Sequence, residues 1–225
     1  MHAVSGGPVI AIDGPSGSGK STVARALAAR LGLRYLDTGA MYRAVTAAVL
    51  AAGEDPAEAA RVTEFVSGVD LEISTDSAAA RVSVDGRDVT GEIRGPSVTA
   101  AVSTVSALPA VRAAMVARQR QIIGTGGIVV EGRDIGTAVA PDADLKVFLT
   151  ADPGERAARR ALETDASPGA TAADLARRDR LDASRVASPL AQAPDAVVID
   201  STDLGADAVV ERILDLLAAP TGRTP

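Results

Sequence analysis

The chain has 225 residues, a formal net charge of −6, 47% hydrophobic residues and only 2% aromatic residues. This length suits one domain whose core is built from Ala, Val, Leu and Ile, and the negative charge argues against nucleic-acid and anionic-membrane partners. The chain has no cysteine, which excludes disulfides, thiolate nucleophiles and cysteine-bound metals, and its single histidine, His2, stands beside the N-terminus. No apolar run is long enough to span a membrane and no signal peptide is apparent, so we expect a cytoplasmic protein.

The first predicted elements are a strand, a phosphate-binding loop and a helix. Val9–Ile12 is an apolar run, the stretch from Gly14 to Thr22 fits the P-loop pattern G-x-x-x-x-G-K-[ST], and helical periodicity follows from Ser21 to Arg30. In such a loop, backbone N–H groups and the helix N-terminus converge on phosphate oxygens. We therefore predict ATP binding, with Lys20 at the outer phosphates and the Ser21 hydroxyl as a ligand of Mg²⁺. The predicted ATP-binding residues are Gly14, Pro15, Ser16, Gly17, Ser18, Gly19, Lys20, Ser21 and Thr22.

Four further apolar runs predict the rest of a parallel sheet. They are Leu33–Leu36, Ile128–Val130, Leu145–Leu149 and Val197–Ile199. Helical patterns separate the runs, which indicates right-handed crossovers and helices on both faces of the sheet. The expected fold is therefore an α/β P-loop NTPase type with a five-stranded parallel sheet, whose ligands bind at the carboxyl ends of the strands.

One segment departs from this alternation. Leu71–Thr75 and Arg81–Val84 alternate apolar and polar residues, and Asp85-Gly86 is typical of a tight hairpin turn. We expect a small antiparallel sheet inserted at residues 67–95. The pattern alone is equally compatible with a decorative surface insertion.

An arginine-rich segment lies nearer the C-terminus. Residues 156–185 hold seven of the 21 arginines, and Ser167–Thr171 has the composition of a flexible tip. This favours a phosphate-clamping lid at residues 155–180. The alternative is a solvated helix with ion pairs to the acidic residues of the segment, which are Glu163, Asp165, Asp174, Asp179 and Asp182. Residues 218–225 are expected to form a flexible tail.

The P-loop alone does not select a reaction. A GTPase switch needs an Asn-Lys-x-Asp element, and the only other lysine, Lys146, stands in Asp-Leu-Lys-Val. Motor ATPases need more chain. Phosphoryl transfer to a small acceptor needs only positioning and charge neutralisation, for which the planar guanidinium of arginine is well suited.

Four further elements carry a resemblance to a known family. They are the segments Asp37–Arg43, Ala101–Arg112, Val130–Gly136 and Arg178–Arg185. In this order and spacing, together with the P-loop, they closely resemble bacterial cytidylate kinases, and the resemblance extends from Val9 to Leu217. It implies transfer of the γ-phosphoryl group of Mg-ATP to CMP or dCMP, in a P-loop fold with a monophosphate-binding insertion and a lid.

The resemblance also implies roles for individual residues. Nine side chains would bind CMP: Thr38, Arg43 and Arg133 at the acceptor phosphate, Ser103, Arg112 and Asp134 at cytosine, Arg178 and Asp182 at the ribose, and Arg185 at the phosphates. We further expect a catalytic group made of Lys20, Arg133 and the lid arginines Arg156, Arg159 and Arg160, which would close over the γ-phosphoryl group.

Physical chemistry supports the base-reading role but leaves alternatives open. A carboxylate such as Asp134 accepts from the exocyclic amino group of cytosine, whereas uracil presents an oxygen there. Arg133 and Asp134 could instead pair with each other, and Arg178, Asp182 and Arg185 could form surface ion pairs on one helical face. Glu131 could contact Mg²⁺ through water or have a capping or structural role.

Two other functions remain to be weighed. One is a kinase of the same fold with a different acceptor, such as adenylate, uridylate or shikimate. The other is a non-catalytic nucleotide sensor. Such a sensor would bind ATP to drive a partner. For the cytidylate kinase function we expect a monomer with ATP and CMP or dCMP as its ligands and no nucleic-acid or membrane partner.

Overall fold

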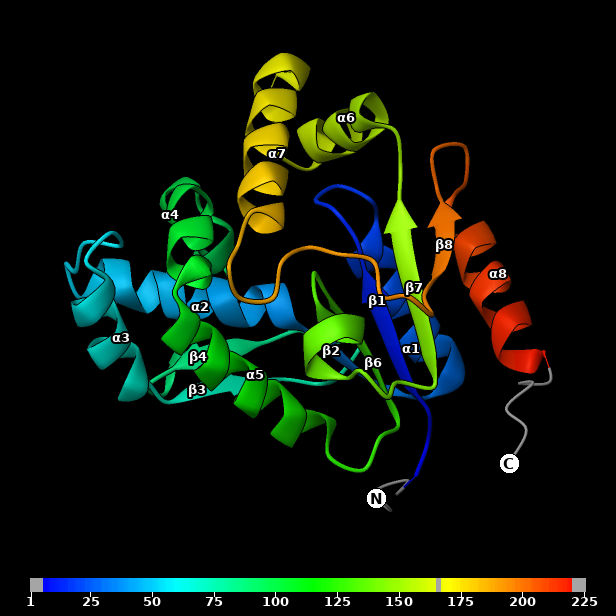
Figure 1. The fold of residues 1–225 in the computed structure, drawn as a ribbon, viewed down its shortest axis with the longest axis horizontal. Coiled ribbons are helices and arrows are strands. Elements are labelled where there is room, and N and C mark those ends of the chain that lie inside the picture. Colours follow the sequence, from blue (N-terminus) through cyan, green and yellow to red (C-terminus); the bar gives the residue numbers. More distant parts are fainter. Residues whose placement is uncertain (1–5, 165–166, 220–225) are drawn as a thin grey trace.

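The central element is a parallel sheet that runs through the molecule (Figure 1). A computed structural model describes residues 6–164 and 167–219. The sheet has the strand order β2-β6-β1-β7-β8, with all neighbours parallel, and its strands are Arg34–Asp37 (β2), Ile128–Gly132 (β6), Val9–Asp13 (β1), Leu145–Thr150 (β7) and Val197–Asp200 (β8). Each contains most of a predicted apolar run, so the predicted α/β fold class is confirmed.

Helices cover both faces of the sheet because its strands are apolar on both sides. On one face, Ile10 and Ile12 of β1 pack against α1 (Lys20–Leu31) and α8 (Ala206–Ala218). On the other face, Ala11 belongs to a second buried cluster with α2 (Thr38–Ala51), α4 (Pro96–Ala107) and α5 (Pro109–Ile123). This alternation follows from the two-residue period of a strand.

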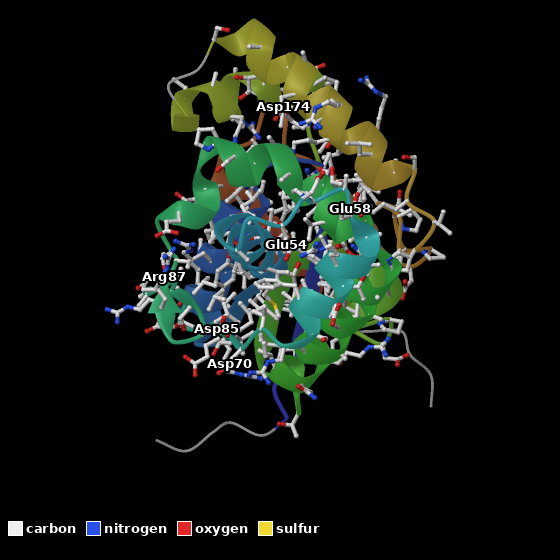
Figure 2. The ribbon with its side chains drawn as sticks, turned by 90° about the vertical axis from the view of Figure 1, so that its left-hand side faces the viewer. Glu54, Glu58, Asp70, Asp85, Arg87 and Asp174 are labelled. Carbon is white, nitrogen blue, oxygen red and sulfur yellow. The ribbon has the colours of Figure 1, made fainter. Side chains whose placement is uncertain are left out.

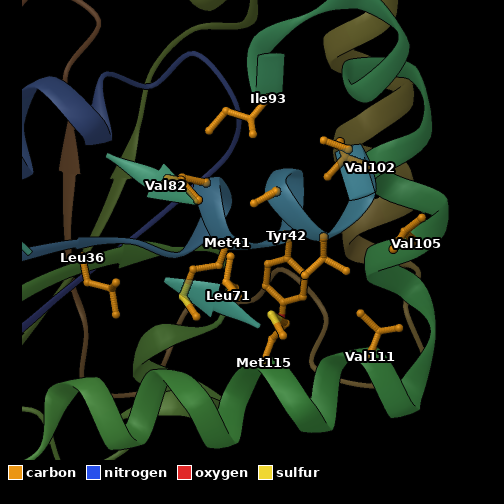
Figure 3. Close-up of a cluster of buried hydrophobic side chains, with 14 of the residues drawn as sticks. Leu36, Met41, Tyr42, Leu71, Val82, Ile93, Val102, Val105, Val111 and Met115 are labelled. Carbon is orange, nitrogen blue, oxygen red and sulfur yellow. The ribbon is translucent and has the colours of Figure 1, made fainter. Parts of the chain in front are cut away.

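The second cluster also incorporates the inserted antiparallel sheet (Figure 3). After α3 (Ala59–Ser67), the insertion contains β3 (Leu71–Ile73), β4 (Val82–Val84), β5 (Arg87–Asp88) and a short 3-10 turn, η1 (Glu92–Arg94). Asp85 and Gly86 both have positive φ, as the predicted hairpin turn requires, and Asp85 lies at the surface (Figure 2).

The insertion is anchored in the core, which contradicts the decorative alternative. Leu71, Val82 and Ile93 are buried beside Met41 of α2. The chain after β3 also extends the edge of the main sheet, because the Tyr35 N–H donates to the Thr75 carbonyl at 2.9 Å. The insertion and the main sheet therefore share one buried apolar cluster.

The arginine-rich segment forms two helices above the carboxyl ends of the strands (Figure 1). They are α6 (Pro153–Thr164) and α7 (Pro168–Ala183), which pack against each other. The predicted flexible tip at Ser167–Thr171 is wrong, because Pro168 begins α7 and the Thr171 hydroxyl donates to the Ser167 carbonyl at 2.9 Å. The prediction failed because proline and glycine are common both in loops and in the first turn of a helix.

The ends of the chain differ in part from the prediction. Helix α8 continues through Ala218, so the predicted tail at 218–225 begins too early. Residues 220–225, His2 and Asp165 lie outside the described residues. Within the described part of the chain, no single helix is long and apolar enough to cross a membrane; α4 and α5 satisfy length and composition only as a pair, bent by 95°.

The shared cluster predicts how strongly the insertion and the sheet depend on each other. Met115→Ala, in α5 beneath Tyr42 and Leu71 (Figure 3), should lower the free energy of unfolding by about 2–5 kcal/mol because it leaves a cavity in a packed core. Urea unfolding measures this change. Leu162→Ala is the control, since Leu162 is 88% exposed and should change stability by less than about 0.5 kcal/mol. Equal losses in both variants would contradict the packing described.

Candidate active site

A cleft of about 620 Å³ opens at the carboxyl ends of the strands, as expected for a parallel sheet. Most of the predicted site residues line it: Ser16, Gly17, Gly19, Lys20, Ser21, Thr22, Thr38, Arg43, Ser103, Arg112, Arg133, Asp134, Arg160, Asp182 and Arg185. The predicted residues that do not line it are Gly14, Pro15, Ser18, Arg156, Arg159 and Arg178. Segments far apart in the sequence therefore meet in one cavity.

The P-loop joins β1 to α1 in a conformation that only glycine supports at its start. Gly14 has φ of 149°, and a Cβ atom there would lie 2.0 Å from the Leu149 carbonyl oxygen. Gly17 and Gly19 also have positive φ, and α1 begins at Lys20 with the free N–H groups of its first turn. The predicted strand, loop and helix are thus all present, in the arrangement that binds phosphate.

Lys20 is folded back onto this loop. Its Nζ donates to the Pro15 carbonyl at 2.6 Å, and the side chain is buried. Burial, followed by the charge of Arg133, lowers the pKa of Lys20 to about 7, although Glu131 and Asp13 act in the opposite direction. An anionic ligand beside Lys20 would raise its pKa and favour the charged form.

Glu131, at the end of β6, links the P-loop to β2. One carboxylate oxygen accepts from the Ser21 hydroxyl at 3.0 Å, and the other accepts from the Tyr35 hydroxyl. Burial, followed by the charge of Asp37, raises the pKa of Glu131 to about 7. A hydroxyl and a carboxylate are the oxygen ligands that suit a hard divalent cation.

A divalent cation would need phosphate oxygens as well. Among the described residues, no group of three or more His, Cys, Asp or Glu side chains could hold a metal ion. Ser21 and Glu131 together fit a cation that arrives with a nucleotide, as Mg²⁺ usually does.

Arg133 and Asp134 follow β6 and point to different partners, so the alternative that they pair with each other is wrong. Arg133 donates to the Gly14 carbonyl at 2.8 Å and to Asp182 at 2.9 Å. Asp134 forms a buried ion pair with Arg112 of α5. The guanidinium of Arg112 also lies 5.3 Å from the centre of the Tyr42 ring.

Ser103 lies at this end of the cleft, on the buried face of α4. The structure thus brings together the three residues expected to read cytosine. Two lining residues here, Tyr42 and Ser106, were not predicted. Ser106 stands one helical turn after Ser103, so helical spacing could have indicated it.

Asp182 of α7 is the centre of a second buried charge cluster. It pairs with Arg133 and with Arg185, and Arg185 also donates to the Ser106 hydroxyl at 2.9 Å. Burial acts to raise the pKa of Asp182, but the charges of Arg133 and Arg185 outweigh it and lower the pKa. Asp182 is 3% exposed and Arg178 is 6% exposed, so the alternative of surface ion pairs is wrong.

Arg178 stands slightly apart from the other residues of this helix. It is buried but does not line the cleft, and its Nε atom has no hydrogen-bond partner among the described residues. Burial, followed by the charge of Arg133, lowers its pKa.

Arg43 and Thr38, the residues expected to hold the acceptor phosphate, both line the cleft. Arg43 donates to the Thr99 hydroxyl at 3.0 Å, and burial, followed by the charges of Arg178 and Arg160, lowers its pKa to about 9. The Thr38 hydroxyl donates to the Glu131 carbonyl at 2.7 Å, which leaves its oxygen free only to accept. Arg94 of η1 also lines the cleft; it was missed because no pattern distinguishes it in the insertion.

The three lid arginines have different surroundings. Arg156 pairs with Asp179 at 2.5 Å and donates to the Ser16 carbonyl at 3.0 Å. Arg159 donates to the Ser201 carbonyl at 2.7 Å. Of the three, only Arg160 lines the cleft. In this structure Arg156 and Arg159 tie α6 to α7, the P-loop and the turn after β8.

The Asp182 cluster predicts a pH-dependent loss of stability. Asp182→Asn should lower the free energy of unfolding at pH 7 by about 3 kcal/mol, because two buried arginines lose their anion. Since the folded-state pKa is lowered, this contribution is present above the ordinary value near 4 and is lost as the pH falls through the folded-state value. The difference between wild type and variant should therefore shrink in acid, as followed by urea unfolding.

Asp174→Asn is the matched control on the same helix. Asp174 pairs with Arg177 at the surface of α7 (Figure 2), and both side chains are substantially exposed. Its removal should cost less than about 1 kcal/mol at any pH. A loss of stability in Asp174→Asn as large as that in Asp182→Asn would contradict the buried cluster. A loss in Asp182→Asn that does not depend on pH would contradict it as well.

The chain is similar to known proteins over most of its length. A sequence profile described as "Cytidylate kinase" matches residues 10–219. The chain is 50% identical over 220 residues to "Cytidylate kinase" of Rhodococcus opacus, covering 95% of this chain and 96% of the relative. It is also 50% identical over 220 residues to "Cytidylate kinase" of Mycobacterium leprae, covering 95% and 97% of the two chains.

A solved structure is similar in fold. It is an uncharacterized protein from Eubacterium ventriosum, with a TM-score of 0.54 at 11% identity, covering 95% of this chain and 99% of that one. At this identity the likeness concerns the fold alone. The family profile and the two relatives show that the chain is a member of the cytidylate kinase family.

Proposed function

We propose that the protein transfers the γ-phosphoryl group of ATP to CMP or dCMP and releases ADP with CDP or dCDP. The observation that carries the proposal is the buried Asp134–Arg112 pair, which lies with Ser103 at one end of a cleft whose other end is the P-loop. Family membership favours the same reaction. It also argues against adenylate, uridylate or shikimate as the acceptor.

The base end has the donors and acceptors that cytosine requires. Asp134 accepts from the exocyclic amino group, while Arg112 and the Ser103 hydroxyl donate to the N3 and O2 acceptors. The nearby ring of Tyr42 holds the Arg112 guanidinium by a cation–π contact. Uracil would place an oxygen against the Asp134 carboxylate and leave a buried polar group without a partner.

The phosphate end positions two anionic groups for direct transfer. The P-loop N–H groups and Lys20 hold the ATP phosphates, and Arg43 and Arg133 hold the phosphate of CMP. An oxygen of that phosphate forms a bond to the γ-phosphorus as the bond from the γ-phosphorus to the bridging oxygen of ADP breaks. The attacking oxygen is ionised near neutral pH, so no general base is needed.

Ser21 and Glu131 are the residues that would hold a Mg²⁺ ion bound with ATP, and the ion would neutralise charge on the phosphate oxygens. Arg160 faces the cleft from α6 and is the lid arginine best placed to contact the transferred group. We propose that closure of α6 and α7 brings in Arg156 and Arg159 and excludes water that would otherwise hydrolyse ATP. A cytoplasmic location and a monomeric state stay predictions.

The direct test is ADP production from Mg-ATP with CMP, dCMP, UMP, AMP, GMP, shikimate or no acceptor. Turnover confined mainly to CMP and dCMP is the expected result. Turnover with another acceptor would keep the phosphate site and reject the base-reading trio. ATP binding without turnover on any acceptor would instead support a nucleotide sensor.

Lys20→Ala should lower turnover by about a hundredfold or more, because it removes a preorganised cation at the transferred group. The fold should persist, as judged by circular dichroism. Lys146→Met is the control, since Lys146 is the only other lysine and pairs with Asp195 outside the cleft; its turnover should stay near that of wild type. Unchanged turnover in purified Lys20→Ala would reject the P-loop role.

Asp134→Asn should reduce the ratio of kcat/KM for CMP over UMP by about tenfold or more, because an amide can donate to uracil as well as accept from cytosine. The KM for ATP should change much less. Steady-state kinetics with both acceptors measures the two effects in one preparation. An unchanged ratio, or an equal rise in KM for ATP and CMP, would reject Asp134 as the base reader.

A further inference from the structure

Asp13 is a buried carboxylate that phosphoryl transfer does not use. It ends β1 immediately before Gly14 and is 4% exposed. Its two oxygens accept from consecutive backbone N–H groups, Oδ1 from Ile135 and Oδ2 from Gly136, both at 2.8 Å. The carboxylate therefore binds the chain that directly follows Asp134.

These two N–H groups begin a π-helical turn, η2 (Ile135–Val139), whose N-cap is Asp134. The Ala138 N–H donates to the Asp134 carbonyl at 2.8 Å, and this hydrogen bond closes the turn that follows Asp134. The first N–H groups of a helical turn have no partner within the turn. Asp13 supplies their acceptors and thereby fixes the backbone from which the Asp134 side chain projects.

The position of Asp13 relates the two ends of the cleft. Arg133 and Asp134 project toward different partners. Arg133 is bonded to Gly14 and to Asp182, whereas Asp134 is bonded to Arg112. A small rotation of the backbone here would move both side chains at once. Asp13, the residue immediately before the P-loop, holds that backbone through its two hydrogen bonds.

The electrostatic surroundings fit a fixed acceptor. Burial raises the pKa of Asp13 to about 6, against the two backbone hydrogen bonds, which lower it. The charge of Asp134 raises the pKa further and that of Lys20 lowers it. At pH 7 to 8 the carboxylate is therefore mainly ionised, and both oxygens accept.

We propose that Asp13 is a positioning residue for acceptor specificity: by holding the Ile135 and Gly136 N–H groups, it orients Asp134 and Arg133 toward CMP. It contacts neither nucleotide itself. The inference rests on the proposed function, because it assumes that Asp134 reads the base.

The test compares wild type, Asp13→Asn and a control, Asp144→Ala, in kcat/KM for CMP and UMP and in KM for ATP. An asparagine has one acceptor oxygen, and its amide would face a backbone N–H, so one of the two bonds is lost. Asp144 accepts from the Val9 N–H at 2.8 Å at the opposite end of the same strand. It therefore controls for the loss of a carboxylate–backbone hydrogen bond that involves β1 but lies away from the cleft.

Asp13→Asn should lower the CMP-to-UMP ratio by about tenfold, the size expected when a buried N–H donor loses its acceptor, with a much smaller change in KM for ATP. Asp144→Ala should keep the wild-type ratio. The ratio is taken within one preparation, so an inactive fraction does not alter it. A merely structural role would lower all activities together and leave the ratio unchanged, which would overturn the proposal.

If wild type itself does not prefer CMP over UMP, the base-reading role of Asp134 is rejected, and the Asp13 proposal is rejected with it. If Asp13→Asn yields no soluble protein, Asp13→Glu, which keeps the charge but displaces the carboxylate, is measured in the same way. A wild-type ratio in Asp13→Glu would then contradict the positioning role.

Discussion

Positive charge buried in the cleft is the constraint on which the site depends. Burial and neighbouring arginines lower the pKa of Arg43 to about 9, and burial followed by Arg133 lowers that of Lys20 to about 7. Charges removed from water are stable only beside opposite charge. Asp134 and Asp182 balance part of this charge, and phosphate groups would balance the remainder. The cleft thus favours anionic ligands through the cost of leaving its cations unpaired.

The fold supplies rigid supports for these charges. Asp13 is the last residue of β1, and Glu131 is the last but one of the neighbouring strand β6. Each uses both carboxylate oxygens to bind a loop or side chains at the cleft. The insertion contributes to the opposite wall through a core that it shares with α2 and α5. Helix α7 adds Asp182 from above. The carboxyl ends of the strands therefore fix the position of the P-loop relative to the Asp134–Arg112 pair.

Much of this arrangement could be predicted from the sequence, and the rest could not for identifiable reasons. Apolar runs located all five strands because strands buried on both faces need them, and the P-loop is a local motif with a local mechanism. The partners of Arg133 and Arg159 could not be predicted, because Asp182 and Ser201 lie 49 and 42 residues away. The base-reading role expected of Ser103 came only from family resemblance, since a serine on a helix has no distinctive pattern.

The most direct test of this account is the binding of CMP, UMP and cytidine to the protein by titration calorimetry at one pH and salt concentration. We predict that CMP binds at least about tenfold more tightly than either of the others, since UMP loses the partner of Asp134 and cytidine loses the phosphate that pairs with the arginines. If cytidine bound as tightly as CMP, pairing of the ligand phosphate with the buried positive charge could not contribute to binding. Equal affinity for UMP would contradict the assignment of the base end.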